Sequence, residues 1–212
     1  MPQKVIGVLV SGTGSNLQAI IDAIESGTID ARIALVIADR PGVFALERAE
    51  KHGIKALCID RKGKDAAALN AAILEALDEA GVDLVVLAGF LSILDARVVA
   101  RYKNAIMNIH PALIPSFCGE GYYGMRVHEA AVRYGVKVSG ATVHFVDEGM
   151  DTGPIILQEC VNVYHTDDAH TLAERVLEAE HKLLPEAVRL FVNGCIRVEG
   201  RRVIICEEGN GR

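Results

Sequence analysis

Short apolar runs alternate with helix-like patterns through the first half of the chain. The runs are rich in Val, Ile and Leu, which is typical of parallel strands buried on both faces. They fall at residues 5–10, 33–38, 56–59 and 84–87. Segments with apolar side chains at helical spacing separate them, at residues 17–24, 43–52 and 66–80. This alternation predicts an α/β fold of the Rossmann-like kind, with a mostly parallel open sheet and helices on both faces.

The second half of the chain has a different rhythm. The predicted elements are a strand at 105–109, an irregular segment at 111–124, a helix at 125–134, strands at 138–146 and 154–163, a helix at 169–192 and a hairpin at 195–205. Pro185 predicts a bend or break in the long helix, because proline removes a backbone donor. No linker or repeat interrupts the chain, so we expect one domain over residues 1–206 and a frayed tail at 207–212.

Composition and charge exclude some classes of function. The formal net charge of −6 argues against nucleic-acid binding, which needs many basic residues to displace phosphate counterions. The longest apolar run, 84–94, contains Gly89 and Ser92 and is too short to cross a membrane. The five cysteines are scattered and form no C-x-x-C pair, which indicates reduced thiols, most of them in the core. We expect a cytoplasmic protein with no nucleic-acid or membrane partner.

A loop of small residues follows the first predicted strand. It comprises Ser11, Gly12, Thr13, Gly14, Ser15 and Asn16. Small side chains let a backbone approach an anion, and the start of the next helix offers free N–H groups, so the loop predicts phosphate binding. Leu17 replaces the third glycine of a dinucleotide fingerprint, and no lysine follows as in a Walker loop. The alternative is a tight turn capped by Ser15 or Asn16.

Asn108 and His110 lie at the end of a predicted strand. Side chains two apart in a strand point the same way, so an amide and an imidazole would face one site. The amide suits a developing oxyanion and the imidazole suits proton transfer near neutral pH, as acyl or formyl transfer requires. The alternative is a strand end where both side chains bind backbone groups.

The segment 147–154, DEGMDTGP, is an acidic, glycine-containing loop between strands. Its spacing does not match a calcium-binding loop. It is either a plain turn or a catalytic loop that brings a carboxylate to a histidine, whose pKa it would raise. The other histidines form no compact ligand group, so we predict no metal; they include His128, His144, His165, His170 and His181.

Together these motifs resemble the folate-dependent phosphoribosylglycinamide formyltransferases of purine biosynthesis. The matching text is SGTGSNLQAI from Ser11, LAGFLSIL from Leu87, NIHPALIP from Asn108 and GATVHFVDEGMDTGPIILQ from Gly140. The resemblance implies a catalytic trio of Asn108, His110 and Asp151. It implies a ribonucleotide site of Gly12, Thr13, Gly14, Ser15, Asn16 and Glu180. It implies folate contacts at Leu91, Ser92, Ile93, Leu94, Asn108, Asp147, Glu148, Gly149, Met150 and Asp151.

Two further site candidates are Lys64 and His144. The family has a basic residue near the folate tail; ungapped counting places Ala66 there, and a shifted alignment offers Lys64. After NIHPALIP, where many members have a PGLHTH-type loop, this chain reads SFCGEGYYGMRVHEA. By the same resemblance, the N-terminal half would bind the ribonucleotide, and the C-terminal half would bind folate and catalyse the reaction.

The implied reaction moves a formyl group from 10-formyltetrahydrofolate to the amine of 5-phosphoribosylglycinamide, in a monomer or homodimer whose partners are small molecules. Asn108 and a protonated His110 would stabilise the intermediate's oxygen, and Asp151 would keep His110 charged. The first alternative is a formyltetrahydrofolate deformylase, which would hydrolyse the same cosubstrate. A methionyl-tRNA formyltransferase, a Rossmann dehydrogenase and a non-catalytic nucleotide-binding module fit less of the sequence. The dehydrogenase lacks a convincing ribose-binding acid, and the binding module leaves the trio unexplained.

Overall fold

The computed structural model describes residues 2–206, and contacts between residues divide the chain into two compact units. Unit 1 is Met1–Asn108 and unit 2 is Ile109–Arg212. The predicted tail at 207–212 lies outside the described residues. A single domain over residues 1–206 stays a prediction.

Unit 1 contains a parallel sheet with the strand order β3-β2-β1-β4-β5. Its strands are β1 (Lys4–Val10), β2 (Ala31–Ala38), β3 (Lys55–Cys58), β4 (Leu84–Leu87) and β5 (Ile106–His110), the last crossing into unit 2. The central strands are buried along most of their length, as the apolar runs predict. The predicted α/β fold with a mostly parallel open sheet is confirmed.

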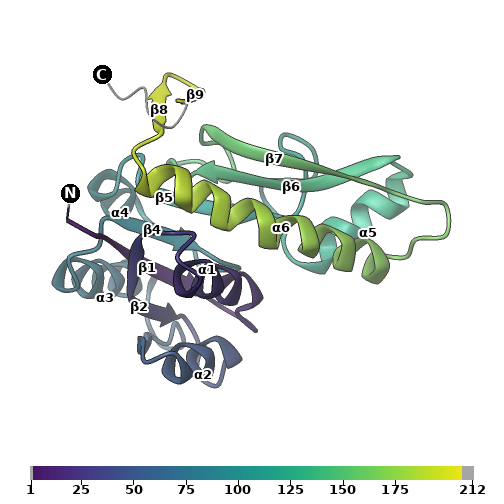
Figure 1. The fold of residues 1–212 in the computed structure, drawn as a ribbon. Helices are drawn as coiled ribbons and strands as arrows, with labels where there is room; N and C mark the ends of the chain where they lie inside the picture. Colours follow the sequence, from purple (N-terminus) through teal and green to yellow (C-terminus); the bar gives the residue numbers. More distant parts are fainter. Residues whose placement is uncertain (1, 207–212) are drawn as a thin grey trace. The chain divides into compact units, whose positions relative to one another are not determined.

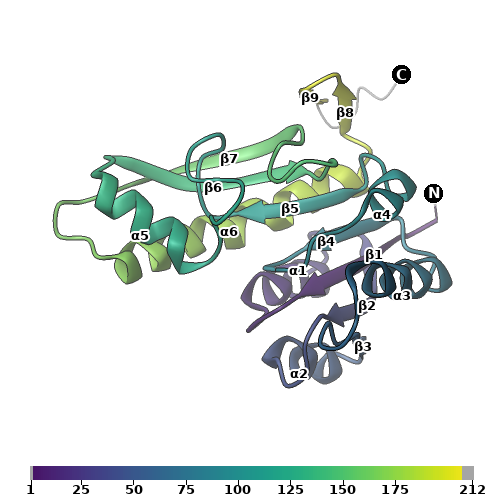
Figure 2. The ribbon, with the colours of Figure 1, turned by 180° about the vertical axis from the view of Figure 1, so that it is seen from behind.

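Helices cover both faces of this sheet. They are α1 (Ser15–Glu25), α2 (Phe44–Lys51), α3 (Ala66–Glu79) and α4 (Ala96–Arg101). The chain moves outward from β1 to β3 and then returns to β4, so right-handed crossovers place α1 and α2 on one face and α3 and α4 on the other. In Figure 1, α1 lies in front of the sheet, and in Figure 2, seen from behind, α3 is the nearer helix. The short α4 was not predicted.

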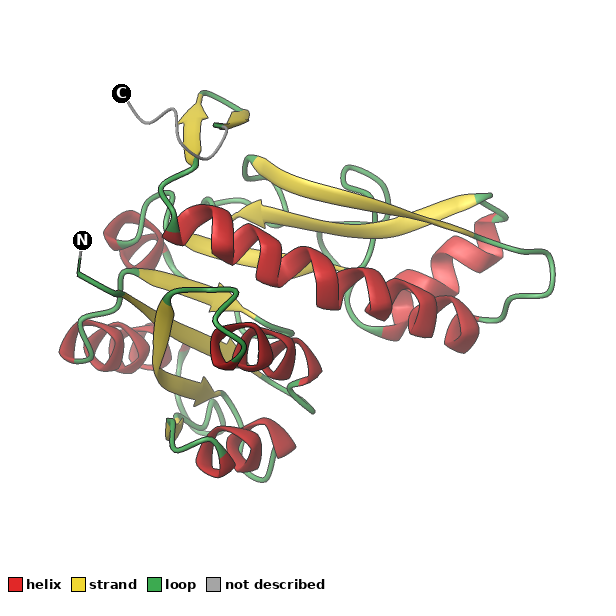
Figure 3. Cartoon of the chain, viewed as in Figure 1, coloured by secondary structure: helices red, strands yellow, loops and turns green. Residues whose placement is uncertain are grey.

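Unit 2 combines an antiparallel strand pair with a long helix. β6 (Val138–Phe145) pairs with β7 (Ile155–Asn162), which meets a hairpin of β9 (Arg202–Ile205) and β8 (Ile196–Glu199). The helix α6 (Ala169–Val192) runs beside β6 and β7, as Figure 3 shows, and α5 (Met125–Tyr134) packs against it. α6 continues through Pro185, so the predicted break is wrong.

The cysteines differ from expectation in one respect. All five are free thiols, as predicted, but only Cys195 is buried. Cys118 is half-buried, and the others, Cys58, Cys160 and Cys206, are exposed. The expectation that most cysteines lie in the core is therefore wrong. Within residues 2–206, the structure has no helix with the length and apolar character needed to span a bilayer.

Candidate active site

The glycine-containing loop connects β1 to α1 in unit 1. Gly14 is the N-cap of α1, with a φ of 75°, and as a glycine it has no side chain that could cap the helix. Ser15 is already helical, and the first turn has no acidic side chain. The N-cap residue itself therefore takes none of the first-turn N–H groups. The turn capped by Ser15 or Asn16 does not form.

Gly14 is required for a second reason. A Cβ atom at this position would lie 2.9 Å from Cα of Ala45, in the first turn of α2. The Arg48 Nε donates to the Thr13 carbonyl over 2.9 Å, and the Ala45 N–H donates to the Gly12 carbonyl over 3.3 Å. The helix α2 thus fixes the loop backbone. Sequence reasoning missed Arg48, because a single arginine on a helix carries no signal of what it touches.

Asn108 and His110 occupy alternate positions near the end of β5. Side chains two apart in a strand share a face, so both point to the same side of β5. Asn108 is half-buried and His110 is buried, with 4% of its surface exposed. The predicted pairing along the strand is present.

Asp151 brings a carboxylate to His110. The His110 Nδ1 lies 3.6 Å from Asp151 Oδ2, and the Asp151 side chain is 12% exposed. The same Oδ2 accepts a hydrogen bond of 2.9 Å from the Gly119 N–H. Asp151 has a φ of 57°, a left-handed conformation that few side chains other than Asn and Asp tolerate. The backbone strain aims this carboxylate into the site.

A second imidazole faces the same carboxylate. The His144 Nε2 lies 3.5 Å from Asp151 Oδ1. The other nitrogen, Nδ1, lies 2.8 Å from the Phe145 carbonyl oxygen. A carbonyl only accepts, so His144 Nδ1 carries a hydrogen. The candidate His144 therefore belongs to the same cluster as His110 and Asp151.

The tautomer of His110 is fixed in the same way. Its Nε2 lies 2.9 Å from the carbonyl oxygen of Phe117, and so carries a hydrogen. In neutral His110 the lone pair is then on Nδ1, the nitrogen that faces Asp151. His110 is set to accept a proton on Nδ1.

Burial decides the charge of these groups. Burial lowers the pKa of His110 below its ordinary value of 6.5, and this outweighs the Asp151 carboxylate, which raises it. Burial raises the pKa of Asp151, but its contacts with His144 and with the Gly119 N–H outweigh burial and lower the pKa below 3.8. These directions favour an ionised Asp151 and a neutral His110 near pH 7. A His110 that is protonated during the reaction, as the resemblance implies, stays a prediction.

His128, on α5, is a third imidazole near this cluster. It is 5% exposed, and its Nδ1 makes no hydrogen bond within the described part of the chain. Burial, together with the nearby His110, lowers the pKa of His128 to about 4. A second positive charge is therefore disfavoured beside His110. Nothing in the sequence around His128 indicates that it lies near His110.

The loop 147–153 is held by its own first residue. Asp147 Oδ1 accepts hydrogen bonds from the Gly149 N–H, over 3.1 Å, and from the Thr152 hydroxyl, over 2.6 Å. Glu148, Gly149 and Met150 are exposed at its tip. The loop is thus a closed turn that presents Asp151, and the two interpretations of this segment are compatible.

The remaining predicted residues are dispersed. Leu91 and Ile93 are exposed and Ser92 and Leu94 half-buried, all in unit 1, so the expected folate contacts do not fall only in the C-terminal half. Lys64 is exposed, and its Nζ donates to the Asp60 carbonyl over 3.1 Å. Glu180 lies on α6 and is buried, with 8% exposed.

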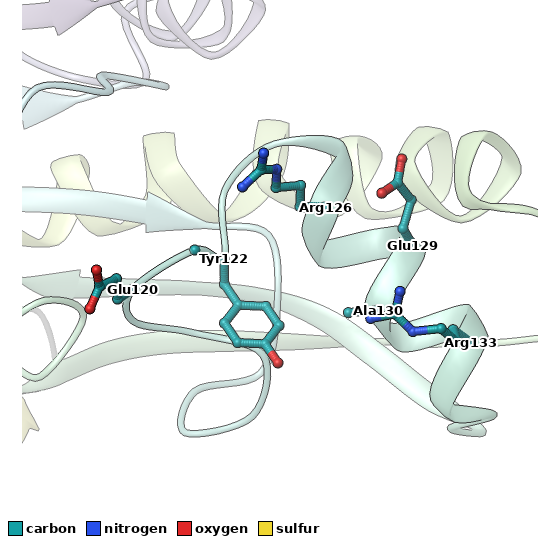
Figure 4. A pocket seen from close by; sticks show the side chains of 7 residues that line it. Glu120, Tyr122, Arg126, Glu129, Ala130 and Arg133 are labelled. Atoms are coloured by element: carbon teal, nitrogen blue, oxygen red, sulfur yellow. The ribbon is translucent and has the colours of Figure 1, made fainter.

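A pocket of about 390 Å³ lies between the loop before α5 and α5 itself (Figure 4). Its lining consists of Glu120, Gly121, Tyr122, Arg126, Glu129, Ala130 and Arg133. None of these is a predicted site residue, and the pocket is separate from the His110 cluster in its lining. In the part of the chain that the structure describes, no three His, Cys, Asp or Glu side chains are grouped to hold a metal.

Comparisons with known proteins identify the family of the chain. The sequence pattern of the formyl transferase family matches residues 4–188. The trifunctional purine biosynthetic protein adenosine-3 of Bos taurus is 45% identical over 207 residues, which are 97% of this chain. The chain spans only 20% of the length of that relative.

Two solved structures show the same fold. Glycinamide ribonucleotide transformylase 1 from Symbiobacterium toebii is 45% identical with a TM-score of 0.92, over 97% of this chain and 95% of that one. A formyltetrahydrofolate deformylase from Pseudomonas syringae is 26% identical with a TM-score of 0.89, over 97% of this chain and 66% of that one. The chain belongs to the formyl transferase family.

Proposed function

We propose that this chain transfers a formyl group from 10-formyltetrahydrofolate to the amine of 5-phosphoribosylglycinamide. The observation that carries the proposal is the carboxylate of Asp151 facing two buried imidazoles, His110 and His144, within 3.6 Å. The extended likeness to a glycinamide ribonucleotide transformylase supports this substrate, since it covers nearly the whole of both chains. Only one activity is proposed, because this chain spans 20% of the length of the trifunctional relative.

In the proposed reaction, the neutral amine attacks the formyl carbon. A C–N bond forms, and the carbonyl electrons move to oxygen, giving a tetrahedral intermediate. The amine nitrogen must then lose a proton, and the departing folate nitrogen must gain one as its bond to carbon breaks. The protein needs a group that accepts and returns one proton near neutral pH.

His110 fits that task because it is neutral at rest with a free lone pair on Nδ1. When it takes the amine proton it becomes an imidazolium, and the ionised Asp151 at 3.6 Å stabilises that charge. Asp151 thus favours His110 in its protonated form during the reaction instead of keeping it charged beforehand. Asn108 would donate its amide N–H to the developing oxyanion.

The ribonucleotide is assigned to unit 1. Gly12, Thr13, Gly14, Ser15 and Asn16 would surround its phosphate. Support comes from the glycine N-cap of α1 and from a first turn without acidic side chains, whose N–H groups and positive dipole end suit an anion. Glu180 would bind the same substrate, as the resemblance implies.

The folate is assigned to two sets of residues. Leu91, Ser92, Ile93 and Leu94 would contact the pterin with apolar surface, and Asp147 to Asp151 would add the polar contacts of their loop. Lys64 would meet the anionic tail, which is consistent with its exposed ammonium group. A monomer or homodimer in the cytoplasm stays a prediction.

A paired assay tests the function against the deformylase alternative. Purified protein is given 10-formyltetrahydrofolate with and without glycinamide ribonucleotide, and both the formylated product and free formate are measured. We expect formylated product in proportion to enzyme, with formate release at least a hundredfold slower. Formate release that is equally fast without the ribonucleotide would identify a hydrolase. No turnover with either combination would remove the proposal.

A further inference from the structure

The segment between β4 and α4 presents apolar side chains to solvent. We call residues 89–95 the ledge. Leu91 is 46% exposed and Ile93 is 70% exposed, although both are large apolar residues. The ledge combines this apolar outer surface with a backbone that is hydrogen-bonded to other parts of unit 1. Three residues make these hydrogen bonds.

Ser11, at the end of β1, holds the start of the ledge. Its side chain is buried, with 5% exposed. Its hydroxyl oxygen accepts a hydrogen bond of 2.8 Å from the Leu91 N–H, and its own N–H donates to the Gly89 carbonyl over 3.0 Å. The peptide groups on either side of Phe90 are therefore tied to one buried residue.

Asn70, on α3, holds the far end. It is 1% exposed. Its amide nitrogen donates to the Ile93 carbonyl over 3.1 Å, and its amide oxygen accepts from the Asp95 N–H over 2.9 Å. One side chain thus bonds the backbone on both sides of Leu94. Its remaining donor reaches the Ala66 carbonyl, over 2.9 Å, within its own helix.

Asp39, directly after β2, holds the middle. It is fully buried, and its Oδ2 accepts a hydrogen bond of 2.7 Å from the Ser92 hydroxyl. Arg61 lies 3.4 Å from Oδ2 and Arg40 lies 3.5 Å from Oδ1, so the buried charge is compensated. The ledge is therefore bonded at three places to three separate elements.

These anchors account for most of the buried polar side chains of unit 1. Among its described residues, the buried polar or charged ones are Ser11, Asn16, Asp39 and Asn70. Burying such groups is costly unless they are hydrogen-bonded, and three of the four make their bonds to a loop with an apolar exterior. A loop that only connected β4 to α4 would not require this.

We propose that Ser11, Asp39 and Asn70 are positioning residues that hold the ledge in its binding conformation before the cosubstrate arrives. Leu91 and Ile93 then offer a fixed apolar surface to a flat ring, so that binding does not have to order the loop. This inference rests on the proposed function, in which the ring is the pterin of a reduced folate. None of the three residues needs to touch the ligand.

The test compares two anchor variants with a matched control. Asn70→Ala and Asp39→Ala each remove an anchor of the ledge. Asp83→Ala is the control, because Asp83 Oδ2 also accepts from a backbone N–H, that of Val5, over 2.9 Å, but at the opposite end of β4. The measurements are dissociation constants for tetrahydrofolate and for glycinamide ribonucleotide by calorimetry, steady-state kcat and KM, and amide hydrogen exchange over residues 89–95.

We expect both anchor variants to bind tetrahydrofolate about tenfold more weakly and to raise the KM for 10-formyltetrahydrofolate by a similar factor. The ribonucleotide dissociation constant and kcat at saturating folate should stay within about threefold of the parent. Hydrogen exchange should speed up over the ledge and not over β1. The control should lower thermal stability and leave both ligands unaffected.

A conservative variant distinguishes positioning from general stability. Asp39→Asn keeps an acceptor for the Ser92 hydroxyl, so it should recover most of the folate affinity lost in Asp39→Ala. If Asn70→Ala does not fold, Ser92→Ala is measured in its place. This variant removes the hydroxyl that binds Asp39 and should weaken folate binding in the same way. Unchanged folate affinity in the folded variants, or equal losses for both ligands, would overturn the inference. A parent protein that does not bind tetrahydrofolate would instead overturn the proposed function.

Discussion

The carboxylate of Asp151 lies at the centre of the candidate active site in unit 2. It faces His110 and His144, and in both histidines the nitrogen farther from it is bonded to a backbone carbonyl. The backbone therefore fixes the position of one proton on each ring, and Asp151 determines where a further proton is favoured. The balance between burial and this carboxylate sets the pKa of His110.

Asp151→Asn should lower the pKa of His110 further. The ionised carboxylate favours the imidazolium, so its removal leaves burial opposed by the hydrogen bond to Phe117 alone. The protonated form of His110 therefore persists to higher pH in the parent and is lost at lower pH in the variant. The check is an NMR titration of the His110 ring protons in both proteins. A midpoint that stays the same or rises would show that Asp151 has no electrostatic effect on His110.

His110→Ala should lower kcat by roughly 10²- to 10⁴-fold, the usual contribution of a general acid–base group. Ligand affinities should change little, because the Nε2 of His110 is bonded to Phe117 within the protein. Stopped assays with saturating substrates, with calorimetry on the same samples, measure both quantities. Turnover close to that of the parent would remove His110 from the mechanism.

His128 gives the protein a measurable sensitivity to acid. Its pKa is about 4 when folded and about 6.5 when unfolded, so the unfolded chain binds more protons between these values. Stability should therefore fall as pH drops from 6.5 to 4, by up to about 3 kcal/mol. In His128→Gln this component is absent, and the free energy of unfolding by urea should depend less steeply on pH. Parallel pH profiles for the two proteins would contradict the assignment.

At the scale of single residues, the sequence predicts which side chains lie together better than it predicts their protonation. The spacing of Asn108 and His110 predicted their shared side of β5, and the acidic loop predicted a carboxylate beside a histidine. Burial disfavours the charged form of His110 that the resemblance implies, and a local motif does not reveal burial. Asp39 was not predicted as a site residue either, since its hydrogen-bond partner Ser92 lies 53 positions away along the chain.

At the scale of elements, the connection from β1 to α1 is the most constrained. Gly14 needs a positive φ, and it has no room for a Cβ atom because α2 packs against it. Gly27, at the other end of α1, has a similar φ of 78°, but no described atom lies within 4 Å of a Cβ there. Gly14 therefore combines a positive φ with close packing, whereas Gly27 has the positive φ without the close packing.

Gly14→Ala should therefore cost more than Gly27→Ala. Backbone strain at a positive φ costs roughly 1–3 kcal/mol at either position, and the contact with Ala45 adds to the cost at Gly14 alone. Ribonucleotide binding should weaken in Gly14→Ala and be retained in Gly27→Ala. Urea unfolding and calorimetry provide the two measurements. Equal destabilisation of both variants would show that the packing against α2 adds nothing.

Most elements were predictable because their apolar spacing is regular. The helix α4 was missed, since six residues do not complete two helical turns and only the side chain of Asp95, which caps the helix, marks its start.

Pro185 was expected to bend or break α6, but the helix continues through it. Tertiary packing along α6 retains the helix through a residue that lacks one donor, because Leu183, Leu184 and Ala187 are buried on either side of it.

At the scale of the whole molecule, the sequence predicted the fold class, and no local pattern in it marks the boundary between the two compact units. The boundary between Asn108 and Ile109 falls inside β5, with no glycine, proline or polar linker to mark it. A unit boundary within a strand depends on which residues contact each other across long stretches of chain, and local patterns contain no record of this.

Ligand selectivity is a property of the whole chain. Both proposed substrates should stabilise the folded protein, by about 2.7 kcal/mol each at a concentration of 100 times Kd. NAD and tRNA should have no effect, given the incomplete dinucleotide fingerprint and the net charge of −6. Thermal unfolding with each compound in turn measures this. Stabilisation by NAD without stabilisation by tetrahydrofolate would favour the dehydrogenase alternative.

Cys118 lies directly before Gly119, whose N–H holds Asp151, and this has a consequence for handling the protein under oxidants. Burial and the Asp151 carboxylate raise the pKa of the Cys118 thiol, which also donates to the Pro115 carbonyl over 3.3 Å. Peroxides and maleimides react with thiolates and hardly at all with thiols. The Asp151 charge, which in the proposed reaction assists proton transfer, therefore also favours the unreactive thiol form of the neighbouring sulfur. Preparations in air should retain an intact Cys118 while exposed Cys160 is modified first.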